Sequence, residues 1–548
     1  MTTECHPIST LPGTSALFRD YADAASSAHA AQMRRWYPTD PFVMDWAIRS
    51  PELSEGHRGK LADVLLRQAE GFGAGEAVLA NIERLRNGAA AVVTGQQVAL
   101  FGGPLLTLLK AATAIRKAQD ATKVSGREHV PVFWLATEDH DLAEVDQVAL
   151  LTKTEVETLK LGLKAERPLP VGALRVDGGT EAGGVTLEAV LDRASELLGW
   201  APVAEFLREC YAPETTLAQG FGRLLTKIFA EHGLVVMDAA VAEYHALGAT
   251  VLRAAIEQAA ELEAALLARS KELEAAGYHA QVLVVPGHSL LFLMDEETGA
   301  RLPLRLTAEG AWKAGPRVFA KEELLAILEN APERLSPNAL LRPVFQDCIL
   351  PTGAYVGGPA EVAYFAQSAV VYEAILGHVT PVLPRLSATL IEPAIAQTMA
   401  AHEVSLAQVY EAKTVDALAQ RLGARAMPIE GKRKLAAVGN AMDTELTALT
   451  EYMDAMSEDL GRAAAVSANK MRYQMSRLRR MAADFEVQKS ASLKKHATAI
   501  VLSVFPEAHL QERLLAGVWF VARYGEGLTQ LLVEHAGQEC PGHRVIYL

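Results

Sequence analysis

The stretch that decides the fold lies at residues 89–119 and reads AAAVVTGQQVALFGGPLLTLLKAATAIRKAQ. Residues 89–93 form a short apolar run, typical of a strand buried on both faces. A turn containing glycines follows at residues 94–103, and apolar residues then recur at helical spacing from Pro104, which suits a first helical position. The turn matches neither a dinucleotide-binding fingerprint nor a Walker loop. It is equally compatible with a phosphate or carboxylate cradle at a helix start and with a merely tight connection.

A second buried strand is predicted at residues 130–136 (VPVFWLA), and it ends in the acid-rich turn TEDHD at residues 137–141. Two strands joined by a helix of this length predict parallel pairing and an α/β fold. Ligands of parallel sheets bind beyond the carboxyl ends of the strands, so both turns are expected at one edge. The TEDHD turn is compatible with a divalent-ion site, a substrate-amine site, an acid–base centre or a solvated helix cap.

The rest of the N-terminal region predicts a core with insertions. A helix at residues 217–232 precedes a third buried strand at residues 233–238 (GLVVMD). The insertions are expected at about residues 151–215 and 241–330. The second begins with one long amphipathic helix to residue 276. It continues with a hairpin at residues 279–295, split at Pro286, which is expected to join residues 301–306 in an antiparallel module.

A further strand is predicted at residues 342–351 (RPVFQDCILP), before a second Gly-Gly-Pro turn that opens a helix. The two Gly-Gly-Pro turns, at residues 102–104 and 357–359, are predicted to face each other across one cleft. Glu361 lies in the first turn of its helix, where a carboxylate is favourable, so capping explains it as well as chemistry does.

Residues 435–485 predict a coiled coil, because apolar residues recur with alternating spacings of four and three. Acidic residues precede a predicted break at Gly461 and basic residues follow it, which favours antiparallel pairing within one chain or between two. The predicted seam consists of Met442, Leu446, Leu449, Met453, Met456, Leu460, Met471, Met475, Leu478, Ala482 and Phe485. Residues 500–548 regain buried apolar runs and are expected to pack back on the core.

Composition excludes several classes of protein. The chain has 548 residues, which predicts two or three domains, and its net charge of −14 argues against nucleic-acid binding. No apolar run reaches the length of a membrane span, and the first residues do not resemble a signal peptide. We therefore expect a cytoplasmic protein that contacts no membrane. The widely spaced cysteines (Cys5, Cys210, Cys348 and Cys540) predict neither a zinc site nor a disulfide framework.

The motifs together resemble the BshC family, the cysteine ligase of bacillithiol biosynthesis, over nearly the full length. The resemblance rests on residues 94–111, 130–145, 233–238 and, above all, 342–367. It implies a Rossmann-like parallel-sheet core related to class I aminoacyl-tRNA synthetases, with inserted connecting modules and a coiled coil that serves dimerisation. The HIGH and KMSKS motifs of the synthetases are absent, and residues 94–97 occupy the place of HIGH. The domains are expected at residues 1–390 (core), 391–499 (helical coiled coil) and 500–548.

The implied reaction joins the carboxyl group of cysteine to the amine of glucosaminyl-malate. Amide formation from a free carboxylate in water is uphill, so we expect ATP as the activator, with Mg²⁺ as a candidate companion ion. The alternative is a non-catalytic, nucleotide-binding assembly or sensor protein that recruits partners through the coiled coil.

The predicted site residues follow from the motifs and the resemblance. The catalytic candidates are Glu138, Asp139 and His140, which would bind the cysteine amine or act as general base. The candidates for substrate or nucleotide binding are Thr94, Gly95, Gln96, Gln97, Gly102, Gly103, Trp134, Asp347, Tyr355, Gly357, Gly358, Glu361 and Tyr364. No metal ligand is assigned.

Overall fold

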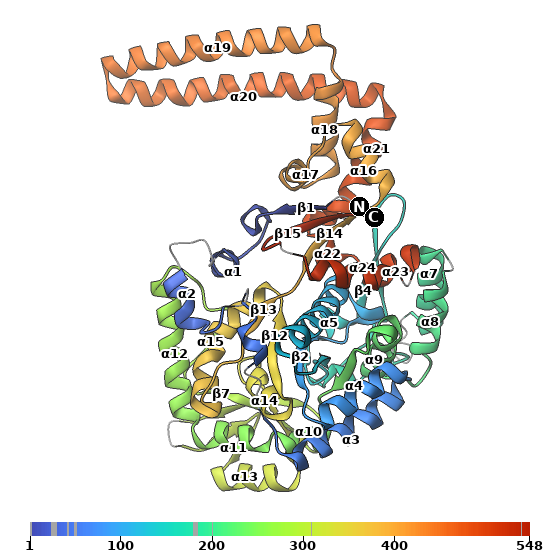
Figure 1. The fold of residues 1–548 in the computed structure, drawn as a ribbon. Coiled ribbons are helices and arrows are strands. Elements are labelled where there is room, and N and C mark those ends of the chain that lie inside the picture. Colours follow the sequence, from blue (N-terminus) through green and yellow to red (C-terminus); the bar gives the residue numbers. More distant parts are fainter. Residues whose placement is uncertain are drawn as a thin grey trace.

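The computed structural model describes residues 3–23, 30–40, 43–48, 52–178, 185–199, 201–307, 310–525, 527–538 and 540–548. These residues form an α/β body from which a long helical hairpin projects (Figure 1). The two chain ends lie side by side on the side of the body that faces the hairpin (Figure 1). No helix in this described part of the chain combines the length and apolarity needed to cross a membrane.

A five-stranded sheet forms the centre of the body, with the order β13-β12-β2-β3-β6 and parallel pairing throughout. Its strands are β2 (Ala90–Gln96), β3 (His129–Leu135), β6 (Val235–Asp238), β12 (Thr352–Gly357) and β13 (Val382–Pro384). Almost every residue of these strands is buried, which explains their continuous apolar runs. The predicted Rossmann-like parallel core is confirmed.

Two helices start at the carboxyl edge of this sheet. Helix α5 (Leu106–Ser125) follows β2 and ends at Gly126, whose positive φ of 69° suits a left-handed cap. Helix α15 (Pro359–Leu376) follows β12 and begins with Pro359 in the first helical turn, where its missing N–H is not needed. The Glu361 carboxylate accepts the Gly358 N–H at 2.7 Å and so caps the helix start.

The insertion between β6 and β12 differs from its prediction in two places. The expected single helix is three helices: α10 (Ala242–Leu247), α11 (Ala249–Glu257) and α12 (Ala259–Ala275). The first break lies at Gly248, where a Cβ would lie 2.2 Å from the Phe345 ring, so the bend lets backbone pack against an aromatic side chain. Of the predicted hairpin at residues 279–295, only β7 (His288–Met294) is a strand.

The predicted antiparallel module does form within the described residues. Strand β7 pairs with β8 (Arg301–Leu306) in a five-stranded sheet with the order β10-β9-β8-β7-β11. Its other strands are β9 (Trp312–Ala314), β10 (Arg317–Phe319) and β11 (Leu335–Pro337). Pro286 and Gly287 therefore lie in the loop before β7 and do not form the turn of a hairpin. The hairpin turn lies between β7 and β8.

The predicted strand at residues 342–351 is wrong. These residues form helix α14 (Arg342–Ile349), with Pro343 in its first turn, and the strand starts at Thr352. Val344, Phe345 and Ile349 are fully buried and lie on a helical repeat, while the buried Asp347 accepts a hydrogen bond from the Tyr372 hydroxyl at 2.5 Å. The short apolar run was therefore compatible with either structure, and tertiary packing selects the helix.

The last part of the chain returns to the body. Strand β14 (Ser387–Ile391) pairs in parallel with β15 (His543–Tyr547), which pairs antiparallel with β1 (Thr3–His6). This pairing brings Cys5 and Cys540 together in a disulfide with a Cα–Cα distance of 5.8 Å. The prediction of no disulfide was wrong, because cysteines 535 residues apart meet only through the pairing of the two chain ends.

The projecting hairpin consists of α19 (Ile429–Met456) and α20 (Glu458–Lys489), which confirms an α-helical coiled coil with antiparallel pairing inside one chain (Figure 1). The turn lies at Ser457, four residues before the predicted break. Arg472 and Asp443 form an ion pair between the helices at 2.7 Å, as the segregated charges favour.

The buried seam of the hairpin is narrower than predicted. Leu446 and Met475 are buried, and Met442 and Met453 are half-buried. The predicted seam residues that are exposed instead are Leu449, Met456, Leu460, Met471, Leu478 and Phe485. Two helices bury only one face of each other, so a wider apolar stripe leaves part of itself uncovered. We call these exposed seam residues the outer stripe.

Candidate active site

A cavity of about 390 Å³ opens at the carboxyl edge of the core sheet. Its walls come from the ends of β2, β3 and β12, from α5 and α14, and from the start of α15. The polar and charged side chains in its lining are Gln96, Gln97, Lys110, Asp139, Glu144, Arg342, Tyr355, Glu361, Tyr364, Arg385 and Arg513. The location is the one expected for ligands of parallel sheets.

A buried ion pair joins two walls of the cavity. Lys110 of α5 and Glu361 of α15 lie 2.5 Å apart, with 4% and 16% of their side chains exposed. Burial lowers the pKa of Lys110, and Glu361 only partly opposes that effect. Burial would raise the pKa of Glu361, but the Lys110 charge together with the hydrogen bonds from Lys110, Tyr355 and Gly358 lowers it overall. The attraction between the two groups offsets part of the cost of burial.

Each member of this pair is fixed by further hydrogen bonds. Lys110 donates to the Gly95 carbonyl at 2.7 Å and to the Gln96 side chain at 2.8 Å, at the end of β2. Glu361 accepts from the Tyr355 hydroxyl at 2.5 Å. The pair therefore holds the end of β2 and the start of α15 in a fixed relative position.

Arginine and the helix start make one side of the cavity cationic. Arg342 donates to the Tyr364 hydroxyl at 2.9 Å and lies over the Tyr355 ring, 5.1 Å from its centroid. Among the described residues no carboxylate lies within ion-pair distance of Arg342. A half-buried guanidinium beside a helix N-terminus is well suited to a carboxylate or phosphate of a ligand.

The opposite side of the cavity is acidic. Asp139 accepts from the Gln97 side chain at 2.6 Å and lies near Glu144. Burial, together with the nearby Asp141 charge, raises the pKa of Glu144. A carboxylate with a raised pKa holds a proton more readily than usual, which suits a group that accepts a proton from an amine.

The structure divides the predicted site residues. Those that line the cavity are Gly95, Gln96, Gln97, Trp134, Asp139, Tyr355, Gly358, Glu361 and Tyr364. Those outside its lining are Thr94, Gly102, Gly103, Glu138, His140, Asp347 and Gly357.

Local contacts explain why some candidates face elsewhere. The Thr94 hydroxyl donates to the Val356 carbonyl, and Glu138 lies 2.9 Å from Nε2 of the buried His245. Gly102 packs beside Leu224 rather than toward the cavity. Only the second Gly-Gly-Pro turn borders the cavity, so the predicted opposition of the two turns across one cleft is wrong.

The cavity also contains residues that the sequence motifs did not indicate, namely Lys110, Glu144, Arg342, Arg385 and Arg513. Lys110 carried a usable signal, because a lysine within the apolar run LLTLLKAATAI is unusual for a buried helix face. Arg342 carried a similar signal, because it is a charged residue at the start of the apolar segment that forms α14. Arg385 and Arg513 carried no such signal, since they reach the cavity only through the packing of the C-terminal region.

The described residues contain no cluster of three or more histidine, cysteine, aspartate or glutamate side chains arranged to hold a metal ion. Mg²⁺ in phosphate-transfer sites is commonly held by one or two carboxylates together with ligand oxygens. Asp139 and Glu144 fit that arrangement, because both line the cavity.

Comparison with protein families decides the assignment. One family model, described as the N-terminal Rossmann-like domain of bacillithiol biosynthesis BshC, matches residues 1–386. A second, the BshC C-terminal coiled-coil domain, matches residues 388–548. The chain belongs to the BshC family. The two models meet at the segment that joins β13 to β14.

Relatives in this family are similar over most of their length. A protein of Koribacter versatilis is 42% identical, with all of both chains covered. One of Solibacter usitatus is 35% identical over 84% of each chain, and one of Salinibacter ruber is 31% identical over 89% of this chain and 88% of its own. All three are named putative cysteine ligase BshC.

Proposed function

We propose that this BshC-family chain is an amide-forming ligase that joins the carboxyl group of cysteine to the amine of glucosaminyl-malate. The observation that carries the proposal is a cavity with cationic and acidic sides at the carboxyl edge of the sheet. Both substrates carry carboxylates and an amine, so each has groups that complement both sides. The name that the relatives carry, putative cysteine ligase BshC, supports a ligase that acts on cysteine.

The cavity residues would divide the work by charge. Arg342 and the start of α15 would bind an oxyanion, and Asp139 would bind the cysteine ammonium. Glu144 would take the proton that the attacking amine loses, since its raised pKa brings it closer to neutral pH. Lys110 would act by holding Glu361, and therefore α15, in place.

ATP is part of the proposal as the source of carboxyl activation. Its phosphates would lie on the cationic side, near Arg342 and Arg385, with Mg²⁺ as a companion ion held mainly by phosphate oxygens and water. Binding all three substrates in one cavity would place the reacting atoms together, which by itself lowers the barrier.

The proposal includes a homodimer formed through the hairpin. Leu449, Met456, Leu478 and Phe485 of the outer stripe are each about half exposed or more. So many exposed apolar side chains on one hairpin are unusual for a monomer, and a second copy of the hairpin would cover them. The resemblance to the family supports this type of contact.

A cytoplasmic location is also proposed, because ATP and free cysteine are available there. The Cys5–Cys540 disulfide is more typical of oxidising compartments. Alkylation of fresh cell extracts followed by mass spectrometry is therefore informative. The cytoplasmic proposal predicts that most of the protein carries alkylated Cys5 and Cys540, and full protection of both would contradict it.

The test of the function is a reconstitution read by mass spectrometry. Purified protein with ATP, cysteine and glucosaminyl-malate should give the thiol product, and omission of any one substrate should abolish it. Arg342→Met should reduce the rate by about 100-fold or more, as expected for a lost charge contact. Arg421→Met, at an exposed ion pair on α18 (Val415–Ala426), is the control. Nucleotide binding without product would favour the non-catalytic alternative.

A further inference from the structure

Arg385 lies at the junction of the two regions matched by the family models. It connects β13 of the core sheet to β14 of the C-terminal sheet. Its backbone N–H donates to the Gly357 carbonyl at 2.9 Å, and the next residue, Leu386, donates to the Thr113 hydroxyl at 2.9 Å. These two hydrogen bonds fix the backbone at Arg385 against both β12 and α5.

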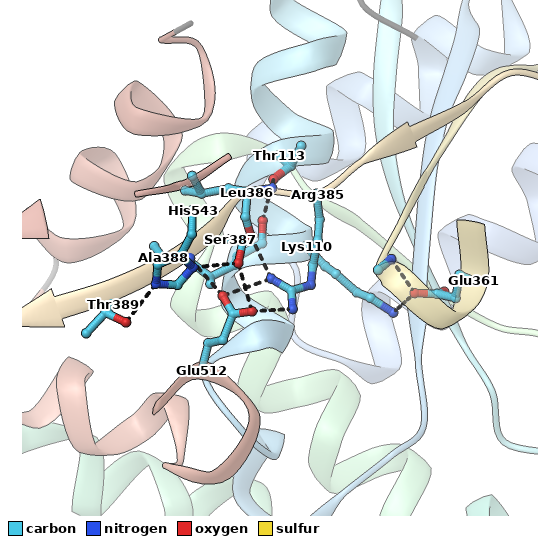
Figure 2. Close-up of polar contacts among 12 residues, drawn as sticks. Lys110, Thr113, Glu361, Arg385, Leu386, Ser387, Ala388, Thr389, Glu512 and His543 are labelled. Carbon is cyan, nitrogen blue, oxygen red and sulfur yellow. Dashed lines mark hydrogen bonds and ion pairs between the residues drawn. The ribbon is translucent and has the colours of Figure 1, made fainter. Parts of the chain in front are cut away.

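Glu512 of the C-terminal region fixes the other end of this side chain. Its Oε1 accepts from Nη2 of Arg385 at 2.7 Å, and its Oε2 accepts from Nη1 at 3.0 Å (Figure 2). The two side chains are 4% and 2% exposed. Burial would raise the pKa of Glu512, but the charge and hydrogen bonds of Arg385, together with the Ala388 N–H and the nearby His543, lower it overall. A two-point contact of this kind defines the orientation of the guanidinium plane.

Glu512 is itself held by the strand that follows Arg385. It accepts from the Ala388 N–H at 2.7 Å and from the Ser387 hydroxyl at 3.1 Å (Figure 2). The preceding residue, Gln511, bonds to both the N–H and the carbonyl of Leu390 at 2.8 Å. Helix α22 (Gln511–Leu514) is therefore locked to β14, and the next residue along it, Arg513, also lines the cavity.

These contacts leave one guanidinium nitrogen for a ligand. Nη1 and Nη2 are used by Glu512 and by the Leu386 carbonyl, whereas Nε has no hydrogen-bond partner among the described residues. A Cβ built on Gly358 would lie 3.5 Å from this Nε and 3.4 Å from Oε2 of Glu361. Nε thus borders the space that the missing side chain of Gly358 leaves at the start of α15.

We propose that Arg385, oriented by Glu512, is a specificity-determining residue whose Nε–H binds an oxyanion of the substrate beside Gly358. Glu512 is a positioning residue, because it acts through Arg385. The C-terminal region then supplies part of the active site rather than only the hairpin. The inference rests on the proposed function for the identity of the substrates, but not for the existence of the oxyanion site.

The first test places a methyl group in the oxyanion space. Gly358 has a φ of −81°, so alanine is allowed there, and its Cβ would meet its neighbours at ordinary contact distances. Gly358→Ala should keep the melting temperature of the wild type and weaken one ligand by about 10- to 100-fold, the effect expected for a lost charged hydrogen bond. Gly56→Ala, at an open position on α3 (Glu55–Gly71), is the control.

Calorimetry with four separate probes identifies the source of the oxyanion: cysteine, glucosaminyl-malate, ATP and inorganic phosphate. Weaker binding of ATP and phosphate by Gly358→Ala assigns the site to a phosphate group. Weaker binding of cysteine or glucosaminyl-malate assigns it to a carboxylate. A wild type that binds none of the four probes, or a variant that binds all of them as the wild type does, overturns the proposal.

The second test addresses Glu512. Glu512→Gln keeps the shape of the side chain but leaves the Arg385 charge unpaired, so the KM for the same ligand should rise about tenfold while kcat changes less. If that variant does not fold, Arg385→Gln with Glu512→Gln removes both charges and should fold with the same loss of binding. Glu534→Gln, an exposed residue on α24 (Gly527–Ala536), is the control.

The outcomes separate this inference from the proposed function. A wild type that binds the probes but gives no thiol product defeats the ligase and leaves the oxyanion site standing. If Gly358→Ala and the Glu512 variants form product with the wild-type KM for every substrate, the proposed role of Arg385 is wrong and the ligase proposal still stands.

Discussion

In the cavity, Lys110 and Glu361 lie 2.5 Å apart with 4% and 16% of their side chains exposed, whereas in the hairpin Arg472 and Asp443 lie 2.7 Å apart with 38% and 59% exposed. The distances are alike, but the surroundings differ. Exposed pairs contribute about 0–1 kcal/mol, because water and salt screen them. Removing one partner of a buried pair leaves an uncompensated charge and costs several times more.

The same contrast applies to apolar residues. The body buries its apolar strands on both faces, while the hairpin leaves an outer stripe in contact with solvent. The body thus covers its own apolar surface, and its buried polar groups are held by specific contacts such as Lys110–Glu361. The hairpin leaves apolar side chains uncovered, which is the basis of the proposed dimer.

The largest expected effect is at the buried pair. Lys110→Met should lower the free energy of unfolding by about 3–5 kcal/mol, because the Glu361 carboxylate loses its counter-charge. Denaturant unfolding provides the measurement. Arg472→Met is the matched control and should change the free energy of unfolding by less than about 1 kcal/mol. Equal effects of the two variants would remove the contrast between body and hairpin.

A double variant sharpens this result. Lys110→Met with Glu361→Met removes both charges, so it should recover most of the stability lost by Lys110→Met alone. The proposed chemistry should not recover with it, since α15 would lose the cap that Glu361 supplies. Full recovery of ligase activity would show that the pair has no part in arranging the cavity.

The next effect depends on pH. Burial lowers the pKa of His543 from 6.5 to about 4, so the unfolded state binds a proton there that the folded state does not. Its contribution to stability is complete above about pH 6.5 and decreases as the pH falls toward 4, by up to about 3 kcal/mol. The difference in unfolding free energy between wild type and His543→Gln should therefore change across this interval. A difference that stays constant from pH 7 to 4 would contradict it.

The smallest effects distinguish the two faces of the hairpin. Met475 is 5% exposed and Leu478 is 52% exposed. Met475→Asp should destabilise the hairpin by about 2 kcal/mol, because it buries a carboxylate without a partner. Leu478→Asp should change stability by less than about 0.5 kcal/mol and weaken the proposed dimer. Sedimentation at several concentrations shows which variant weakens the dimer. A wild type that stays monomeric at micromolar concentration would contradict the dimer proposal.

Much of the fold could be predicted from the sequence because it depends on local patterns. Strands β2, β3 and β6 were identified by apolar runs, and α5 and α15 by helical spacing after Gly-Gly-Pro. Helix α14 was missed because its apolar run is short enough for a strand. The hairpin was predicted, but the width of its buried face was not, since spacing does not show how wide a stripe the partner helix covers.

The cavity was less predictable, for a different reason. Motif residues such as Gln97, Asp139 and Tyr355 lie within or just after the core strands, so the strand order places them at one edge. Arg385 and Glu512 are 127 residues apart and meet only through the pairing of β14 with the C-terminal region. No local pattern records that contact.

The central claim is that the cysteine carboxyl group is activated by ATP and then joined to the amine of glucosaminyl-malate in this cavity. Cysteine labelled with ¹⁸O in both carboxyl oxygens tests it most directly, read by mass spectrometry of all products. The account predicts that the amide keeps one labelled oxygen and that the other appears in AMP or in phosphate, in equal amount. Thiol product without label in either nucleotide or phosphate, or no product with all three substrates present, would contradict it.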